Sequence, residues 1–475
     1  MVGFIGRDPE LAQLKRHLDQ VTDGGRTGRP GRALLIRGRR RVGKSRLAEE
    51  FIRSADVPAL FFTASAQPSA ELDLRLFVEA AAASALPGAE VFLDQHPENW
   101  DAALRLLVRA LPGDRPSIVV FDEVPYLIAH DPGFEGTLQK IFDRELSQVP
   151  VLILLIGSDL AMMESLNTYG RPFYQRGTEM VVPPLNPLDV AAMLELPPAE
   201  AFDAYLVSGG LPMILDEWPR GATVDAYLAQ AVTDPTSALL VTGERTLAAE
   251  FPPEALARAV LTAIGSGERT YRLIGQAAGD LSEASLSRAL NLLADKRIVQ
   301  ADKPLSTQPS RETRYHIVDP HLRFWLAFLG PNMSVIERGR GDVVMKQITK
   351  SWADWRGRAI EPVIREALER LAPDLLPPHT DVVGAYWTRT NDPAIDLVGA
   401  DRSPIARRIT AVGSIKWQER RPFDAHDMAR LIVHRAQLPG ADEYTPLIAV
   451  GRAGVSAAGV LAVTPDDLLN AWQQR

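Results

Sequence analysis

A short segment with two glycines, a lysine and a serine is the part of this sequence best suited to bind phosphate. Gly38 is followed by four residues and then by Gly43, Lys44 and Ser45. The two glycines let the backbone curl so that its N–H groups point at phosphate oxygens. We expect Lys44 to reach the β- and γ-phosphates of a nucleotide, and the Ser45 hydroxyl to bind Mg²⁺.

The elements around this segment are those that a phosphate-binding loop needs. An apolar run of strand length, residues 33–36, precedes it, and a helical pattern, residues 44–52, follows it. The N-terminus of such a helix adds N–H donors and a partial positive charge. This strand–loop–helix setting predicts a nucleotide site with these residues: Gly38, Arg39, Arg40, Arg41, Val42, Gly43, Lys44, Ser45 and Arg46.

Two adjacent carboxylates follow an apolar run further along the chain. Residues 116–121 read as a buried strand that ends at Asp122 and Glu123. We expect Asp122 to support the Mg²⁺ together with Ser45. Glu123 is then placed to orient or deprotonate the water that attacks the γ-phosphate.

Three polar residues further along are candidates for contacts with the γ-phosphate. Ser158 follows an apolar strand, residues 151–156, and we assign it the role of sensing the γ-phosphate or the attacking water. Capping of the next helix is an equally open alternative that is compatible with this role. Arg171 and Arg176 lie in the loop before the fifth predicted strand. Each could stabilise phosphate charge or form a surface ion pair, and Arg176 is the one that we assign a catalytic role.

Composition limits the class of protein. The chain has 475 residues, enough for about three domains, and no cysteine, which excludes disulfides and thiolate metal sites. Its net charge of −8 gives no global basic field for nucleic acid. No signal-peptide pattern and no apolar run of membrane-spanning length is present, so we expect a cytoplasmic protein without a membrane partner.

The rest of the chain predicts further domains of a multidomain α/β protein. Residues 254–319 read as three short helices and a β-hairpin around a polar tip, residues 306–312, which is typical of a winged helix. Such a module serves either DNA contact or protein contact. The last 120 or so residues begin with a helix predicted over 355–371 and continue with strands at 382–387, 395–398, 409–417, 445–450 and 460–463. The predicted domains are an ATPase core (1–186), a helical lid (187–250), a winged helix (251–330), a connector (331–350) and a C-terminal α/β domain (351–475).

Several of these motifs together resemble one known family. The phosphate loop, Phe121-Asp122-Glu123, Gly157-Ser158 and the opening residues 4–11 resemble the archaeal and bacterial ATPases of the STAND branch of AAA-related P-loop NTPases. The segment 314–320 looks like the middle region of that family. The C-terminal part looks like its DUF234 domain, a relative of PD-(D/E)xK nucleases.

This resemblance implies additional nucleotide contacts. Ile5 and Gly6 should lie against the adenine, and Pro212, in Gly210-Leu211-Pro212, should touch the base from the lid. Proteins of this branch are nucleotide-controlled switches, in which ADP holds a closed form and ATP an open one. A weak ATPase can still be an effective switch when the lid and the nucleotide are coupled.

The resemblance also implies a relic of a nuclease site. Asp396 matches the strand acid of such nucleases, Lys416 matches the lysine, and Glu361 could supply another acid. Ser414 stands where a second strand carboxylate is expected, and a serine is a poor anionic ligand. We therefore expect a restriction-nuclease-like fold that does not cut.

The favoured function is that of an ATP-binding, Mg²⁺-dependent, slow ATPase acting as a switch, with output through the winged helix and the C-terminal domain. Two alternatives remain open: an ATP-dependent DNA-processing nuclease, and a non-hydrolysing, ATP-bound DNA-binding regulator. The expected partners are ATP and ADP, together with double-stranded DNA or a protein, and the chain could form oligomers.

Overall fold

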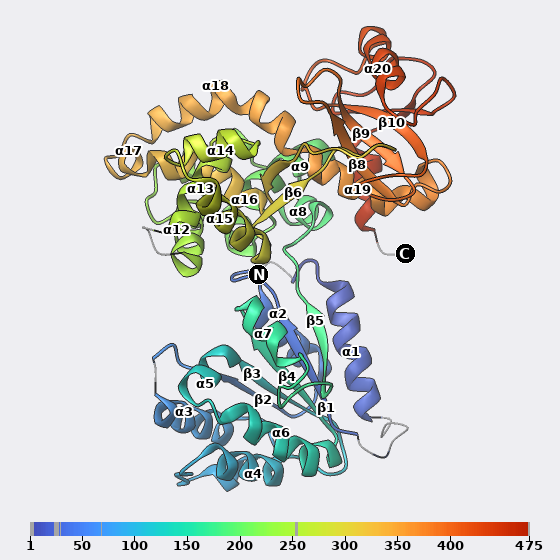
Figure 1. Cartoon of the computed structure of the whole chain (residues 1–475). Coiled ribbons are helices and arrows are strands. Elements are labelled where there is room, and N and C mark those ends of the chain that lie inside the picture. Colours follow the sequence, from blue (N-terminus) through green and yellow to red (C-terminus); the bar gives the residue numbers. More distant parts are fainter. Residues whose placement is uncertain (1–3, 23–27, 29, 68, 252–254, 474–475) are drawn as a thin grey trace. The chain divides into compact units, whose positions relative to one another are not determined.

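The computed structural model (Figure 1) describes residues 4–22, 28, 30–67, 69–251 and 255–473. The chain divides into two compact units, Met1–Leu185 and Asn186–Arg475. Each unit has its own five-stranded sheet.

A parallel sheet with the order β2-β3-β4-β1-β5 forms the centre of the first unit. Its strands are β1 (Arg32–Arg37), β2 (Ala59–Thr63), β3 (Ser117–Asp122), β4 (Val151–Gly157) and β5 (Gly177–Val181). The predicted α/β fold with a parallel sheet is thus confirmed. All strands point the same way, so the carboxyl ends of β1, β3 and β4 lie at one edge, where α/β proteins bind ligands.

Burial explains why the central strands are so apolar. Every residue of β3 and β4 is buried, because both faces of a parallel sheet are covered. Aromatic rings fill part of this core, and Phe77 stacks on Phe121 with their ring centroids 5.7 Å apart. The helices of the unit are α1 (Asp8–Thr22), α2 (Lys44–Ala55), α3 (Ala70–Ala82), α4 (Trp100–Ala110), α5 (Val124–His130), α6 (Phe134–Arg144) and α7 (Leu160–Leu166).

The second unit begins with helices. Those of the predicted lid region are α8 (Pro187–Leu194), α9 (Pro198–Ser208), α10 (Pro212–Glu217), α11 (Val224–Ala231) and α12 (Ala238–Glu250). Three more helices and a two-stranded antiparallel hairpin follow: α13 (Leu256–Gly265), α14 (Tyr271–Ala277), α15 (Glu283–Asp295), β6 (Val299–Asp302) and β7 (Arg314–Ile317). Their order and lengths follow the pattern expected from the sequence.

The start of the hairpin loop makes contacts that its polar composition did not indicate. The Leu305 backbone N–H donates to the Ala385 carbonyl (2.8 Å), and Ser306 forms a β-bridge with Ile405. Leu305 and Ser306 are both buried. The start of the loop is therefore anchored on the C-terminal part of the unit. Polar composition alone did not reveal this, because Leu305 adds apolar surface that gains from burial.

A second difference concerns the helix predicted over 355–371. The structure has α16 (Pro320–Phe324), α17 (Met333–Glu337), α18 (Gly341–Ala359) and α19 (Glu361–Leu375). Ile360 lies between α18 and α19, so the prediction of one continuous helix over 355–371 is wrong. Pro362 explains the break: it lacks an N–H and suits the first turn of a new helix.

The C-terminal sheet is mixed and has the order β12-β11-β10-β9-β8. Pairs β8–β9 and β9–β10 are antiparallel, whereas β10–β11 and β11–β12 are parallel. Its elements are β8 (Val382–Trp387), β9 (Ala394–Ala400), β10 (Ile409–Lys416), α20 (Ala425–Gln437), β11 (Leu447–Gly451), β12 (Leu461–Val463) and α21 (Pro465–Leu469).

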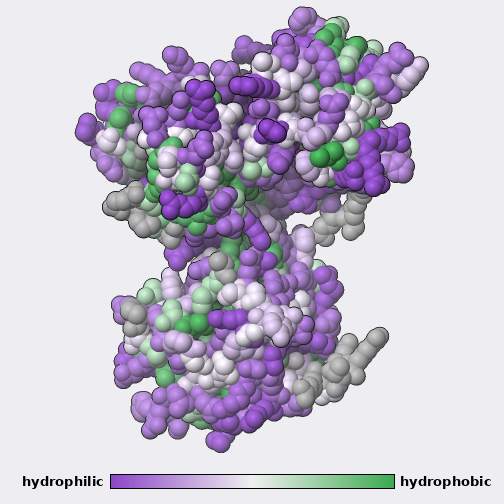
Figure 2. All heavy atoms as spheres, in the orientation of Figure 1, coloured by the Kyte–Doolittle hydropathy of each residue, from purple (hydrophilic) through white to green (hydrophobic). Residues whose placement is uncertain are grey.

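Hydrophilic residues cover most of the face seen in Figure 2. Exposed large apolar side chains include Ile432 and Val433 of α20. None of the described helices is both long and apolar enough to cross a membrane.

Candidate nucleotide site

The loop between β1 and α2 has the backbone that phosphate binding requires. Gly43 has φ 90°, in the left-handed region, and directly precedes α2. A Cβ on Gly38 would lie 2.4 Å from the Val182 carbonyl oxygen, so only glycine fits there. These two positions explain the glycines at the start and end of the motif.

The Lys44 ammonium lies inside this loop. Its Nζ donates to the carbonyl oxygens of Gly38 (2.8 Å) and Arg39 (3.0 Å). Burial lowers the pKa of Lys44 from 10.5 to about 8, although the negative charges of Glu123 and Asp122 oppose this shift. A phosphate at the loop would replace the two carbonyls with a stronger, charged partner.

Ser45 and Asp122 meet where α2 begins and β3 ends. The Ser45 hydroxyl donates to Asp122 Oδ2 at 2.7 Å. Asp122 is buried, and burial is the main reason why its pKa is raised. A hydroxyl and a carboxylate oxygen side by side are hard oxygen ligands of the kind Mg²⁺ prefers, so this pair fits the predicted metal.

Glu123 and Ser158 form the second pair at the same edge of the sheet. The Ser158 hydroxyl lies 3.1 Å from Glu123 Oε1 and 3.0 Å from Oε2. Glu123 has φ 56°, a conformation that costs a non-glycine residue about 1–3 kcal/mol and is typical of functional sites. Asp159 caps α7 by accepting from the Met162 N–H, so the capping alternative for Ser158 is wrong.

The opening segment is tied to the loop through an arginine that the motif analysis did not single out. Buried Arg7 donates from Nη2 to the Val42 carbonyl (2.8 Å) and pairs with Glu10 (3.1 Å). Ile5 and Gly6 directly precede Arg7 in sequence, so this bond places their turn beside the loop. In the sequence, Arg7 is recognisable only as a charged residue directly before a predicted helix, and this does not indicate a contact with the phosphate loop.

Of the loop arginines, Arg40 and Arg46 are exposed, whereas Arg39 and Arg41 are partly buried. Arg40 donates to the Tyr126 hydroxyl (3.1 Å), and exposed Arg46 lies 3.8 Å from the Glu49 carboxylate. Pro212 is in the second unit, in the first turn of α10, after Gly209 and Gly210 with positive φ. Its predicted contact with the base stays a prediction.

Arg171 and Arg176 are engaged in ion pairs with α6. Arg171 pairs with Glu135, and Arg176 Nε donates to both Asp143 carboxylate oxygens at 2.9 and 3.0 Å. Arg176 Nη1 also donates to two loop carbonyls. These are the ion pairs expected as the alternative, and the catalytic assignment of Arg176 stays a prediction.

The predicted relic nuclease residues are each held by other partners. Asp396 Oδ2 accepts from the Ser414 hydroxyl (2.9 Å) and from the Ile415 N–H (2.9 Å). Lys416 pairs with Asp427 (3.1 Å). Glu361 accepts from Arg365 (2.8 Å). Within the part of the chain that the structure describes, no three histidine, aspartate or glutamate side chains gather as a metal cluster would require.

Comparison with protein families identifies two parts of the chain. Residues 3–154 match the family model of an AAA ATPase domain, which confirms the ATPase domain expected there. Residues 325–428 match DUF234, a family described as archaeal and bacterial proteins of unknown function, which confirms the expected C-terminal region.

Individual relatives are distant. An uncharacterized protein of Methanocaldococcus jannaschii is 24% identical over 459 residues, covering 94% of this chain and 95% of its own length. The Walker-type ATPase of Pyrococcus abyssi is 19% identical with a TM-score of 0.48, covering 68% of this chain and 96% of that one. The ORC2 protein of Aeropyrum pernix, solved with ADPNP and ADP, is 14% identical with a TM-score of 0.45, covering 74% and 98%.

Proposed function

We propose that the protein is an ATP-binding, Mg²⁺-dependent ATPase that acts as a nucleotide-controlled switch. The observation that carries this proposal is the pairing of side chains at the edge of the first sheet. Ser45 lies against Asp122, and Ser158 lies against Glu123, beside a loop that holds the Lys44 ammonium. A phosphate site, a metal-ligand pair and a carboxylate for water are what hydrolysis of a nucleoside triphosphate requires.

Each residue has a definite part in the proposed reaction. The loop N–H groups and Lys44 bind the phosphates, and Glu123 orients the attacking water and accepts its proton. Ser158 positions the Glu123 carboxylate. Ser45 and Asp122 would hold Mg²⁺, which when bound supplies positive charge for the phosphate oxygens. Arg176 is proposed to stabilise γ-phosphate charge, a role that competes with its ion pair to Asp143.

Ile5 and Gly6 are proposed to lie near the adenine. The bond from Arg7 to the Val42 carbonyl supports this, because it fixes the preceding turn at the loop. Pro212 is proposed to contact the base from the second unit. Gly209, with positive φ, ends α9, and Pro212 then begins α10 after a turn of three residues.

The second unit is proposed to carry the output. Its parts are a helical lid (187–250), a winged helix (251–330), a connector (331–350) and a nuclease-like domain (351–475). Three helices followed by an antiparallel hairpin support the winged helix. Ser414 at the acidic position and the Lys416–Asp427 ion pair support a C-terminal domain that does not cut nucleic acid.

Limited proteolysis of the full chain tests the switch. We expect one cleavage pattern with ADP and a different one with ATP, using Glu123→Gln to prevent hydrolysis. The Lys44→Ala variant, which should not retain nucleotide, is the control and should give one pattern throughout. Identical patterns with ADP and ATP, at concentrations where both are bound, would contradict a switch. Nicking of plasmid DNA that Asp396→Ala abolishes would instead favour the nuclease alternative.

A further inference from the structure

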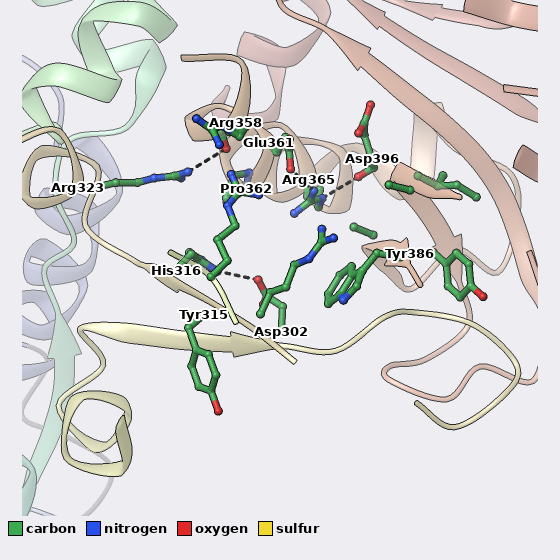
Figure 3. A pocket seen from close by; sticks show the side chains of 16 residues that line it. Asp302, Tyr315, His316, Arg323, Arg358, Glu361, Pro362, Arg365, Tyr386 and Asp396 are labelled. Atoms are coloured by element: carbon green, nitrogen blue, oxygen red, sulfur yellow. Dashed lines mark hydrogen bonds and ion pairs between the residues drawn. The ribbon is translucent and has the colours of Figure 1, made fainter. Parts of the chain in front are cut away.

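A cavity in the second unit is lined by an unusual number of arginines (Figure 3). It has a volume of about 200 Å³ and lies between the β6–β7 hairpin, α16, the α18–α19 junction and strands β8 and β9. Figure 3 shows Arg323 extending toward the junction where Arg358 and Arg365 lie. The arginines that line it are Arg269, Arg314, Arg323, Arg358 and Arg365.

The carboxylates of the cavity are largely occupied. Glu361 accepts from Arg365 at 2.8 Å, and Asp302 pairs with His316 at 2.8 Å. The Asp396 carboxylate is bound by β10, as described above, and only its backbone carbonyl accepts from Arg365 (2.9 Å). One of the five arginines is therefore neutralised within the cavity.

Among the described residues, the other four arginines form no hydrogen bond or ion pair with a carboxylate, although the charge of Glu361 acts on Arg269, Arg314 and Arg323 from a distance. Arg323 donates to the backbone carbonyls of Ala359 (3.4 Å) and Arg358 (3.2 Å). Arg358 donates to the Asp354 carbonyl at 3.3 Å.

The remaining two are Arg314 and Arg269. Arg314 contacts the Asn391 amide oxygen and stacks on Trp387, with 4.4 Å to the ring centroid. For the Arg269 guanidinium, the described part of the chain offers neither a hydrogen bond nor an ion pair.

Several like charges that surround one hollow repel each other when water is partly excluded. The pKa of Arg323 is lowered to about 10, first by burial and then by the charge of Arg269. Burial also lowers the pKa of Arg269. The negative charge of Glu361 opposes this pKa shift, and the positive charges of Arg358 and Arg365 add to it. An anion in the cavity would relieve this repulsion and supply the missing partners.

We propose that this cavity binds a phosphate group, with Arg269, Arg323 and Arg358 as its main ligands. Planar guanidinium groups donate two hydrogen bonds at once to phosphate oxygens, which ammonium groups cannot do in the same way. All residues of this site belong to the second unit, whereas the phosphate loop belongs to the first. The proposed site is therefore distinct from the ATPase site and does not depend on hydrolysis of ATP.

A second cavity beside the first offers room for a ligand larger than a single phosphate. It has a volume of about 320 Å³ and shares Arg269, Arg323 and Arg358 with the first. Its other lining residues include Trp355 and Phe328, which could contact an apolar part of the ligand. The phosphate would then belong either to a free nucleotide or to the backbone of a nucleic acid.

Thermal unfolding of the full chain with inorganic phosphate gives the first test. Two cavity variants are compared, Arg358→Gln and Arg269→Gln. Arg358 is exposed and forms no ion pair among the described residues, so its replacement should disturb folding little. Arg370→Gln removes the same charge from α19 but outside the cavity, where Arg370 pairs with Glu366 (2.7 Å), and is the matched control. We expect phosphate to raise the Tm of the wild type and of the control, and to raise that of the two cavity variants much less.

Stability without phosphate distinguishes a ligand site from a structural cluster. Removing one of several repelling charges should leave the Tm of Arg269→Gln in phosphate-free buffer equal to that of the wild type or higher. A Tm that falls in both buffers by the same amount would overturn the proposal, because the arginines would then serve folding.

Two labelled probes identify the source of the phosphate. Fluorescent ADP is titrated in a Lys44→Ala background, so that the phosphate loop does not contribute, and a fluorescein-labelled DNA duplex of 20 base pairs is titrated in parallel. If the cavity variants bind one of the probes with an affinity lower by about tenfold or more, and the control variant binds it as the wild type does, the result supports the site and identifies the class of its ligand. Unchanged affinity for both probes, with unchanged stabilisation by phosphate, overturns it.

Discussion

Ser158 Oγ lies 3.1 and 3.0 Å from the two carboxylate oxygens of Glu123. The two residues come from the ends of neighbouring parallel strands, β4 and β3, so the sheet itself brings them together. A hydroxyl that can donate to either oxygen limits rotation of the carboxylate. We infer that Ser158 sets the direction in which Glu123 presents its free lone pairs to water.

The Ser158→Ala variant should lower kcat by about tenfold and leave nucleotide affinity unchanged. This is less than the 10²–10⁴-fold typical of losing a general base, since Glu123 remains but is less well oriented. Steady-state phosphate release over a range of ATP concentrations separates kcat from KM. Ser158→Thr, which keeps the hydroxyl, should restore most of the rate, and Ser165→Ala on α7 serves as the control. A Ser158→Ala variant with wild-type kcat would contradict a positioning role.

Nucleotide affinity should depend on pH through Lys44. Its pKa of about 8 lies below the ordinary value of 10.5, so above pH 8 the free protein holds Lys44 largely neutral. Bound phosphate favours the charged form, and binding above pH 8 must therefore include uptake of a proton. We expect the affinity for ADP to be constant below about pH 7.5 and to fall by up to about tenfold per pH unit above pH 8.

Isothermal titration calorimetry with ADP and EDTA checks this, because the apparent enthalpy changes with the ionisation enthalpy of the buffer when protons are taken up. We expect such a buffer dependence at pH 8.5 and none at pH 7. An affinity that does not change between pH 7 and 9.5 would show that Lys44 does not titrate there.

Asp203 should be important for the stability of the second unit. This buried aspartate of α9 accepts from Trp417 Nε1 (2.9 Å), Arg356 (2.8 Å) and Arg452 (3.0 Å). Without the Asp203 charge, the only carboxylates among the described residues that still pair with these arginines are Glu419 for Arg356 (3.2 Å) and Glu200 for Arg452 (3.6 Å), and neither carboxylate is buried. Breaking a buried charge network in this way typically costs about 3–5 kcal/mol. We expect Asp203→Asn to lower the free energy of unfolding of this unit by about 3 kcal/mol.

Urea titration followed by tryptophan fluorescence measures this effect. Of the eight tryptophans, only Trp100 lies in the first unit, so the signal reports mainly on the second. Asp216→Asn, which changes an exposed aspartate of α10, is the control and should alter the midpoint little. Equal midpoints for both variants would mean that the network contributes nothing to stability.

The parts of this structure that could be predicted from sequence are those with local signals. The phosphate loop has fixed spacing, and the apolar runs of β3 and β4 are long because both faces are buried. Asp122 and Glu123 were found because they directly follow such a run. In each case the residues that define the feature are neighbours in the chain.

The parts that sequence reasoning missed depend on residues far apart in the chain. Asp203 and Trp417 are 214 positions apart, and no spacing rule links them. The arginines of the cavity come from a loop, a hairpin and three helices, and each alone resembles an ordinary surface charge. Only the folded chain brings these groups together.

Hydrolysis of ATP by the purified full chain with Mg²⁺ tests the central claim most directly. Wild type, Glu123→Gln and Lys44→Ala are compared, with and without double-stranded DNA. We expect slow phosphate release by the wild type, a loss of about 100-fold or more in Glu123→Gln with nucleotide still bound, and loss of both binding and turnover in Lys44→Ala. Wild-type turnover in Glu123→Gln, or nucleotide held by the wild type without turnover under any condition, would contradict the proposed ATPase.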